Sequence, residues 1–277
     1  MDHPTIAHFA KAKPRLPNGV VTVLLCESAL HLRATADHAV RHGTKAIVAI
    51  GTASVALGDP GVPVIRIGED PGDRNAPALI SAAMEALEGR WVLWLWNGEF
   101  FHFPFCETRA LGDLTEFLES ERRKLIYTYT LDLYADPMPG AESAPQNVPM
   151  HFDRIGYYAF PEQDQTLRVY GSLCWRFEEI APKWMRQIGR ASLVKAERDM
   201  RLGPDLHFDD PAFASVSCPW HRSPTAAMMS LRSARRITSH PDFAMRRDSL
   251  IWHGSVPFEW TSRQLLDLGM IEPGQWF

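Results

Sequence analysis

The sequence predicts an α/β protein built on a doubly wound, mostly parallel sheet. Two observations predict this class: short runs that are apolar at every position, and helical patterns that alternate with them. A strand that is apolar on both faces has to be covered on both, as in parallel sheets flanked by helices. The order strand, helix, strand, strand, helix, strand in the N-terminal part of the chain fits this arrangement.

The first strand and helix follow a turn signal at Asn18-Gly19. The β-branched run at 20–25 is expected as a buried strand, and the pattern over 31–42 as the helix that follows it. Ser28 is the expected N-cap, and Gly43 the stop.

The next strands are expected at 46–50 and 62–67, with a turn-rich stretch between them. A helix then opens at Asn75 and Pro77 and closes at Gly89, and the aromatic run over 91–96 is a fourth buried strand.

The remaining elements are predicted from weaker patterns. Thr108 is expected to cap a helix that carries Leu111, Leu114, Phe117 and Leu118, and 125–133 alternates as a fifth strand. The later expectations are a strand at 167–175, helices at 182–190, 225–235 and 261–268, and a turn-rich path over 207–220.

The domain organisation follows from a stretch at 136–150 that is dense in Pro, Gly, Ala and Ser. We expect an N-terminal arm over 1–18, an α/β half over 19–138 and a mixed C-terminal region over 139–277, with the two larger parts packed as one domain.

Composition excludes several classes of protein. A formal net charge of -4 gives no overall basic face for nucleic acid. The cysteines form no CxxC pair and no close Cys/His set, which favours a reducing compartment over a disulfide framework or a zinc site. No apolar run approaches the roughly 18 residues of a membrane span. We therefore expect a cytoplasmic protein that does not span a membrane, either free or peripheral to the inner membrane.

Candidate ligand-binding residues lie where the predicted strands end. In open parallel sheets, ligands bind beyond the carboxyl ends of the strands. This edge is expected to gather Cys26, Glu27, Gly51, Asn97 and Glu99. Two of these residues also have structural interpretations: Glu27 as an acid that favours a helix dipole, and Glu99 as a solvated acid at a strand end.

The residues over 89–104 resemble the strand, acidic motif and aromatic-proline segment of the family-2-like glycosyltransferases. Further matches lie at 106–118, at the Leu-Asp-x-Tyr of 131–134, at 151–157, at 191–195 with Leu206-His207, and from 248–250 to 268–270. The resemblance implies a glycosyltransferase A fold whose C-terminal region faces the acceptor. It also implies a bacterial transferase of polysaccharide biosynthesis.

The resemblance implies a site for a divalent cation, Mg²⁺ or Mn²⁺, that neutralises the diphosphate of a nucleotide-sugar. The positions that match the two metal-binding aspartates are Trp96 and Gly98, which leaves Glu99 as the one carboxylate. His207 matches a histidine of the family pattern and is expected either to complete the cation site as a second ligand or to contact phosphate. The motif is therefore degenerate.

The resemblance also implies catalytic and donor-binding roles. Asp132 or Asp153 is the expected general base that deprotonates the acceptor hydroxyl, with a structural ion pair as the alternative for Asp132. Lys195 is an expected donor-binding residue. Positive charge at Arg168, Arg232, Arg235 or Arg236 offers another way to hold a diphosphate without a metal, or forms a solvated basic face.

The leading function is transfer of a sugar from a nucleotide-sugar to a glycan or similar acceptor, with an altered donor site. The alternative is a catalytically inactive glycosyltransferase-like protein that binds a glycan or a partner and regulates an active transferase. A hydrolase that uses the histidines ranks last, because its ligands are not closely spaced.

Overall fold

The computed structural model describes residues 2–140, 143–161, 167–181, 186–209, 223–246 and 249–276. The chain forms two compact units, each made of separate stretches of sequence. Unit 1 comprises 1–98, 106–127 and 191–215, and unit 2 comprises 99–105, 128–190 and 216–277. The expected boundary at 138 stays a prediction.

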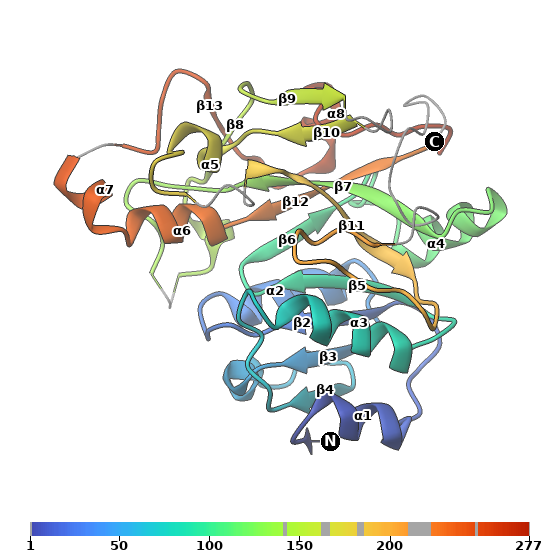
Figure 1. Ribbon diagram of the computed structural model, residues 1–277. Coiled ribbons are helices and arrows are strands. Elements are labelled where there is room, and N and C mark those ends of the chain that lie inside the picture. Colours follow the sequence, from blue (N-terminus) through green and yellow to red (C-terminus); the bar gives the residue numbers. More distant parts are fainter. Residues whose placement is uncertain are drawn as a thin grey trace. The chain divides into compact units, whose positions relative to one another are not determined.

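The predicted α/β class is confirmed: the main sheet has nine strands among the described residues and is mostly parallel (Figure 1). In unit 1 the strand order is β1-β4-β3-β2-β5-β11, and in unit 2 it is β7-β12-β6. Two strands, β7 and β11, have residues in both units. The strands of this sheet are β1 Asp2–His3, β2 Val21–Leu25, β3 Ala46–Ile50, β4 Val64–Ile67, β5 Trp91–Trp96, β6 Glu99–His102, β7 Leu125–Asp132, β11 Gly189–Lys195 and β12 Thr225–Ser230.

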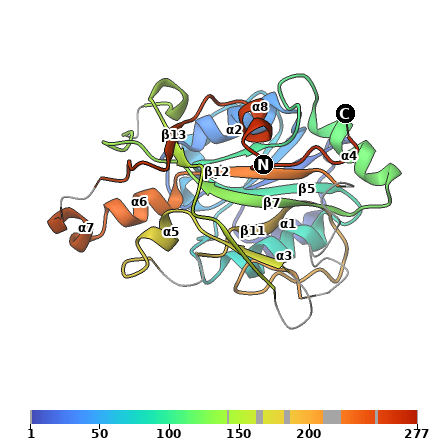
Figure 2. The ribbon, with the colours of Figure 1, turned by 90° about the horizontal axis from the view of Figure 1, so that it is seen from above.

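Helices cover both faces of the strands of unit 1, as a doubly wound sheet requires. Figure 2 shows α1 and α3 on one face and α2 on the other. The helices and the short 3-10 turn of this unit are α1 Ile6–Ala12, α2 Leu32–Arg41, η1 Thr52–Leu57, α3 Ala76–Ala86 and α4 Leu111–Ser120.

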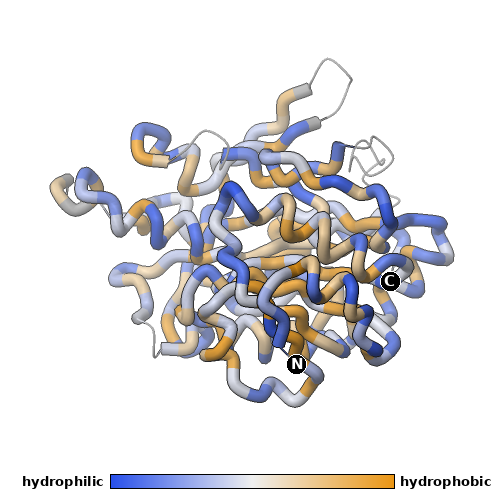
Figure 3. The backbone as a smooth tube through the Cα atoms, turned by 60° about the horizontal axis from the view of Figure 1, so that its bottom comes forward, coloured by the Kyte–Doolittle hydropathy of each residue, from blue (hydrophilic) through white to orange (hydrophobic). Residues whose placement is uncertain are grey.

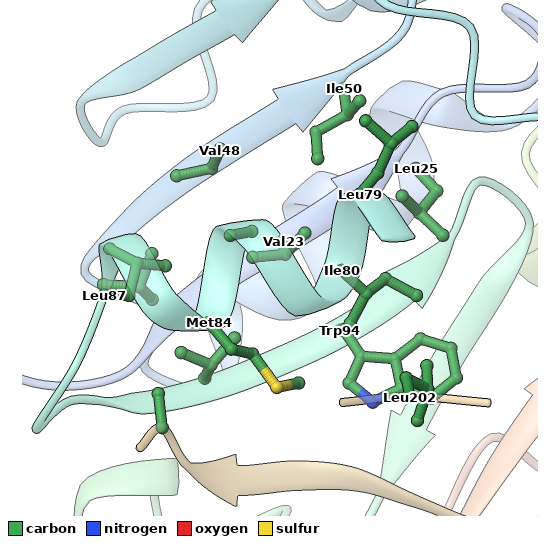
Figure 4. Packing of buried hydrophobic residues seen from close by; sticks show 14 of the residues in the cluster. Val23, Leu25, Val48, Ile50, Leu79, Ile80, Met84, Leu87, Trp94 and Leu202 are labelled. Carbon is green, nitrogen blue, oxygen red and sulfur yellow. The ribbon is translucent and has the colours of Figure 1, made fainter. Parts of the chain in front are cut away.

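The core of unit 1 forms between α3 and one face of the strands. Figure 4 shows side chains of α3 such as Ile80 and Met84 directed at Val23 and Trp94 of the sheet. Trp94 also donates its indole N–H to the carbonyl of Ala191, at 2.7 Å, so the buried polar atom is satisfied. Figure 3 shows hydrophobic and hydrophilic segments alternating along the tube, with hydrophilic segments in many of the outer turns.

Unit 2 carries two further small sheets, β9-β10 and β8-β13, both antiparallel. Its core includes Tyr134, Leu173, Phe177 and Ile237. The further elements of this unit are η2 Pro145–Asn147, β8 His151–Asp153, β9 Tyr158–Pro161, β10 Leu167–Tyr170, α5 Leu173–Arg176, α6 Arg232–Thr238, α7 Pro241–Arg246, β13 Ser255–Pro257 and α8 Ser262–Asp267.

Several local predictions were wrong. The N-cap of α2 is His31, because Ser28 bonds instead to the N–H of Leu30 within the preceding turn. The cap of α4 is Ala110, whose N–H donates to Asp113. Residues 225–230 form β12 rather than the start of a helix, and β6 was not foreseen.

The N-terminal residues, expected as an arm, form β1 and α1. Asp2 and His3 pair with the last two residues of β4, and Phe9 is buried in the core of unit 1. Thr5 caps α1 by accepting a hydrogen bond from the N–H of His8. Residues 182–185 of the expected helix at 182–190 lie outside the described residues, and the rest of it was predicted wrongly: Gln187 forms a β-bridge with Tyr170, and β11 begins at Gly189. Most of the turn-rich path over 207–220 also lies outside the described residues.

Candidate functional site

The turns that follow β2 and β5 in unit 1 are joined by the side chain of Asn97. Its amide oxygen accepts hydrogen bonds from the N–H groups of Glu27, at 2.9 Å, and Ser28, at 3.3 Å. Its amide nitrogen donates to the hydroxyl of Ser28, at 3.1 Å, and to the carbonyl of Leu30, at 3.0 Å. Asn97 therefore fixes the backbone of the turn after β2, and its oxygen is already engaged.

Gly51 allows the ends of β2 and β3 to approach each other closely. Its φ is +133°, and a Cβ atom here would lie 2.3 Å from the carbonyl oxygen of Cys26. The N–H of Cys26 donates to the carbonyl of Ile50, at 2.7 Å. Gly51 is thus required by the backbone geometry of this edge.

Cys26 is buried at the end of β2, and its thiol donates to the carbonyl of Leu24, at 3.4 Å. Burial raises the pKa of Cys26 to about 12, although the positive charge of Arg66 acts in the opposite direction. A thiol with this pKa is protonated at neutral pH and is a poor nucleophile.

Glu27 is exposed, two residues beyond the end of β2. Its backbone is held by Asn97, and the neighbouring Gly98 donates its N–H to the hydroxyl of Thr35, at 2.8 Å. The structure therefore brings Cys26, Glu27, Gly51 and Asn97 to one edge of unit 1, as the sequence predicts.

Two arginines that the sequence reasoning missed lie at the same edge. Arg66 on β4 donates to the carbonyls of Ser54, at 3.3 Å, and Gly58, at 2.9 Å. Arg33 on α2 has a guanidinium nitrogen 3.6 Å from the point that a Cβ on Gly58 would occupy. Both cations therefore lie against the 3-10 turn that follows β3. The signal that could have found Arg66 is a charge in the middle of an otherwise apolar strand.

Glu99 is buried in unit 2 and paired with Arg190. The two guanidinium nitrogens of Arg190 donate to its two carboxylate oxygens, at 3.2 and 2.6 Å. This bidentate geometry excludes a solvated strand-end acid, because only 2% of the Glu99 side chain is exposed. Both oxygens serve an internal cation, so Glu99 does not fit a site for Mg²⁺ or Mn²⁺.

Lys195 lies in unit 1 at the other end of β5 from the candidate edge. It is opposite Trp91, the first residue of that strand, and its ammonium group contacts Glu119 at 2.8 Å. The indole N–H of Trp91 donates to the same carboxylate oxygen, and these hydrogen bonds lower the pKa of Glu119. The structure does not bring Lys195 together with Glu27.

His207, the predicted second metal ligand, lies in a turn of unit 1. Its Nδ1 is 2.9 Å from the carbonyl of Asp205 and 3.7 Å from the Asp205 carboxylate. Across the described residues, no group of three or more His, Cys, Asp or Glu side chains comes together in a way that could hold a metal ion.

Asp132, a predicted general base, is buried at the end of β7 in unit 2. It accepts hydrogen bonds from the N–H of Leu173, at 3.1 Å, and from the hydroxyls of Ser172 and Ser233. Burial raises the pKa of Asp132 to about 6, and repulsion from Asp153 acts in the same direction. The structure therefore places the two predicted bases within electrostatic reach of each other.

Asp153 on β8 is buried and accepts four hydrogen bonds from three side chains. One nitrogen of Arg176 donates to both carboxylate oxygens, at 2.9 and 3.1 Å, and the indole of Trp252 donates at 2.6 Å. Tyr134 donates its hydroxyl to the same carboxylate. Burial, followed by the bond to Asp153, raises the pKa of Tyr134 above its ordinary value. These contacts hold the carboxylate within unit 2, and the role of Asp153 as general base stays a prediction.

The other cations named from the sequence lie in unit 2. Arg168 donates to the side chain of Gln187, at 3.1 Å. Arg232, Arg235 and Arg236 belong to α6.

None of the helices described in the structure is long and apolar enough to cross a bilayer.

Comparisons with known proteins give little. No family model matches the chain, and no curated protein matches it. Among solved structures, the chain resembles HddC from Yersinia pseudotuberculosis at 9% identity and a TM-score of 0.32, over 64% of this chain and 74% of that one. It also resembles the UTP-bound UGPase from Acinetobacter baumannii at 8% identity and a TM-score of 0.33, over 83% of this chain and 97% of that one. Likenesses this distant do not assign a function.

Proposed function

We propose that the chain is a glycosyltransferase-type protein that binds a nucleotide-sugar at the carboxyl edge of the unit 1 strands, with arginines in place of a metal ion. The observation that carries the proposal is the position of Arg33 and Arg66 at the edge where Glu27 and Gly51 also lie. Ligands of open parallel sheets bind at this edge. The motifs that resemble the family-2-like glycosyltransferases support the choice of a nucleotide-sugar.

The charges of these side chains indicate which part of the nucleotide-sugar each of them would bind. Guanidinium groups form paired hydrogen bonds with phosphate oxygens, so Arg33 and Arg66 are suited to a diphosphate. The exposed carboxylate of Glu27 is an acceptor only, and it is suited to the hydroxyls of a ribose. Because Glu99 is paired with Arg190, we expect binding that needs no divalent cation.

A binding experiment tests this proposal. The thermal unfolding of the protein is followed with UDP, GDP, CDP and dTDP and their sugars, in EDTA and with Mg²⁺ or Mn²⁺. We expect one nucleotide to stabilise the protein by about 2.7 kcal/mol at a hundredfold excess over its Kd, with no need for metal. An absence of any shift would contradict the proposal, and a shift that needs metal would contradict the role of the arginines.

A matched pair of variants locates the site. Arg66→Gln removes a guanidinium that bonds two backbone carbonyls at the candidate edge. Arg90→Gln removes one that bonds the carbonyls of Leu16 and Pro17, at 3.0 and 2.7 Å, beside the start of β5. The nucleotide shift should be lost in the first variant and retained in the second.

A second candidate is a catalytically inactive glycosyltransferase-like binding protein. One observation favours it: the carboxylates of Glu99, Asp132 and Asp153 are all buried and engaged by donors of the chain itself. Measuring the free nucleoside diphosphate released from the nucleotide-sugar that binds separates the two. Release that grows with an added glycan supports transfer, and binding without release supports the inactive protein.

A further inference from the structure

The hairpin of β9 and β10 in unit 2 gathers aromatic side chains on one face. Tyr158 and Phe160 are two residues apart on β9, and Tyr158 is directly opposite Tyr170. Residues at such positions project from the same face of a sheet. Trp175 of α5 joins this set, with its ring centroid 5.3 Å from that of Tyr158 and 6.4 Å from that of Phe160.

Two of these four aromatic side chains, Tyr158 and Phe160, are exposed, and Tyr170 and Trp175 are half-buried. Tyr158 and Phe160 are each 46% exposed, and they are the only aromatic side chains among the exposed large hydrophobic residues that the structure describes. Ring pairs that face each other stabilise a small hairpin, but that role does not require both residues to remain nearly half exposed. The exposure points to a ligand.

The arrangement of the rings is suited to stacking. Phe160 is inclined by only 27° to both Tyr158 and Trp175, so the three rings share a common orientation. Tyr170 meets Phe160 edge-on, at 63°. Aromatic faces carry partial negative charge, and a pyranose ring presents polarised C–H groups on its faces that complement it.

Hydrogen-bonding groups border the rings. Arg168 is directly opposite Phe160, and its guanidinium is held by Gln187 at 3.1 Å. Tyr158 and Tyr170 add two hydroxyls. An aromatic face with such a border matches a molecule that has apolar ring faces and hydroxyl edges, which is the chemistry of a sugar.

The size of the exposed surface separates a sugar from a protein partner. Two aromatic side chains of 150–250 Å² each, exposed by 46%, offer roughly 200 Å² together. A stable protein interface needs about 800 Å² from each partner. The face is therefore the size of one or two sugar rings.

We propose that the aromatic face formed by Tyr158, Phe160, Tyr170 and Trp175 binds a glycan chain by stacking. The identification of this glycan as the acceptor rests on the proposed function, whereas glycan binding itself does not. The face lies within unit 2, and the nucleotide site is proposed within unit 1, so each can fail alone.

Native gel electrophoresis through soluble glycans tests the proposal. The protein is run through gels that contain amylose, dextran, hydroxyethyl cellulose or alginate. For any glycan that retards the protein, the Kd of a hexasaccharide of that glycan is then measured. The variant Tyr158→Ala/Phe160→Ala removes both exposed rings. The control Tyr158→Phe/Phe160→Tyr keeps both rings and exchanges the hydroxyl between them.

We expect at least one glycan to retard the wild type, and the double alanine variant to bind it about tenfold more weakly or worse. The ring-exchange control should stay within a few-fold of the wild type. Circular dichroism and thermal unfolding confirm that the variants are folded. Equal retardation of all three proteins, or no retardation by any glycan, would overturn the proposal. Alanine variants that lose self-association or vesicle binding, with glycan binding unchanged, would also overturn it.

The nucleotide experiment remains informative whatever the glycan result. If a nucleotide still stabilises Tyr158→Ala/Phe160→Ala against thermal unfolding while this variant has lost glycan binding, the result supports two separate sites. If a nucleotide stabilises the wild type but no glycan binds to it, the result supports the proposed function and contradicts the glycan-binding proposal.

Discussion

Arg190 donates hydrogen bonds to both carboxylate oxygens of Glu99, and the two side chains are 6% and 2% exposed. Removing one partner of such a pair leaves a buried charge without compensation, whereas removing both costs far less. Glu99 thus acts in the stability of unit 2, although its position in the sequence suggests a ligand.

We therefore expect Glu99→Ala to lower the free energy of unfolding by about 3–5 kcal/mol. The double variant Glu99→Met/Arg190→Met should recover most of this loss. Urea denaturation measures both. Glu85→Ala is the control, because its pair with Arg201 is 51% and 50% exposed and should contribute only about 0–1 kcal/mol. A stable Glu99→Ala protein that has lost nucleotide binding would instead support the ligand role.

Asp132 makes the stability of the protein depend on pH. Burial raises its pKa from 3.8 to about 6, so the folded state holds this proton where the unfolded state has lost it. Stability is full below pH 3.8 and falls as the pH rises towards 6. The pKa difference, about 6 minus 3.8, corresponds to roughly 3 kcal/mol.

The measurement is the free energy of unfolding between pH 4 and pH 7 for the wild type and Asp132→Asn, with the difference between the two as the readout. Asparagine does not titrate, so the wild type should lose stability relative to the variant as the pH rises through this window. A difference that stays flat with pH would show that Asp132 is ionised at the same pH in both states.

The fold class of unit 1 could be predicted because strands at the centre of its sheet, β3 and β5 among them, are apolar at every position. The runs at 46–50 and 91–96 match β3 and β5 residue for residue. The same argument failed for β12, because Ala and Met at 226–229 are good helix formers, and it is the pairing with β6 that makes this run a strand. The helix propensity of single residues does not predict a pairing with a strand that is distant in sequence.

The candidate site was predictable only where the strand ends define it. Cys26, Glu27, Gly51 and Asn97 follow from the rule about parallel sheets, so their common edge was foreseen. The partner of Glu99 was not foreseen, because Arg190 is distant in sequence and no local pattern joins them. Lys195 was assigned by resemblance alone, and β11 runs antiparallel to β5, which places its last residue at the start of that strand.

Gly51 and Gly61 separate backbone strain from steric exclusion. Both have positive φ, at +133° and +84°, but a Cβ atom on Gly61 would meet no atom within 4 Å. A Cβ on Gly51 would lie 2.3 Å from the backbone oxygen of Cys26. We expect Gly61→Ala to cost about 1–2 kcal/mol from its φ alone.

Gly51→Ala should cost at least about 2 kcal/mol more than Gly61→Ala, because the ends of β2 and β3 have to separate. Guanidinium denaturation of the two variants gives the comparison. If the costs are equal, the strand ends adjust easily and Gly51 is not required for the shape of the candidate edge.

The donors around Asp153 distinguish a structural carboxylate from a catalytic one. Trp252 contributes an indole N–H at 2.6 Å, and the guanidinium of Arg176 lies 4.6 Å from the centre of its ring. Trp252→Phe removes this N–H but keeps an aromatic ring beside Arg176. One lost hydrogen bond to a charged acceptor predicts a loss of about 1.5–3 kcal/mol in unfolding free energy.

Asp153→Asn provides the decisive comparison, because it keeps the size of the side chain and removes the charge that Arg176 faces. If Asp153 is structural, thermal unfolding of both variants should shift to lower temperature, with the larger shift in Asp153→Asn, because that change leaves a partly buried cation unpaired. If Asp153 is the general base of a transfer reaction, Asp153→Asn should retain the wild-type unfolding temperature and lose release of nucleoside diphosphate in the presence of acceptor. The four hydrogen bonds that three side chains already donate to this carboxylate favour the first result.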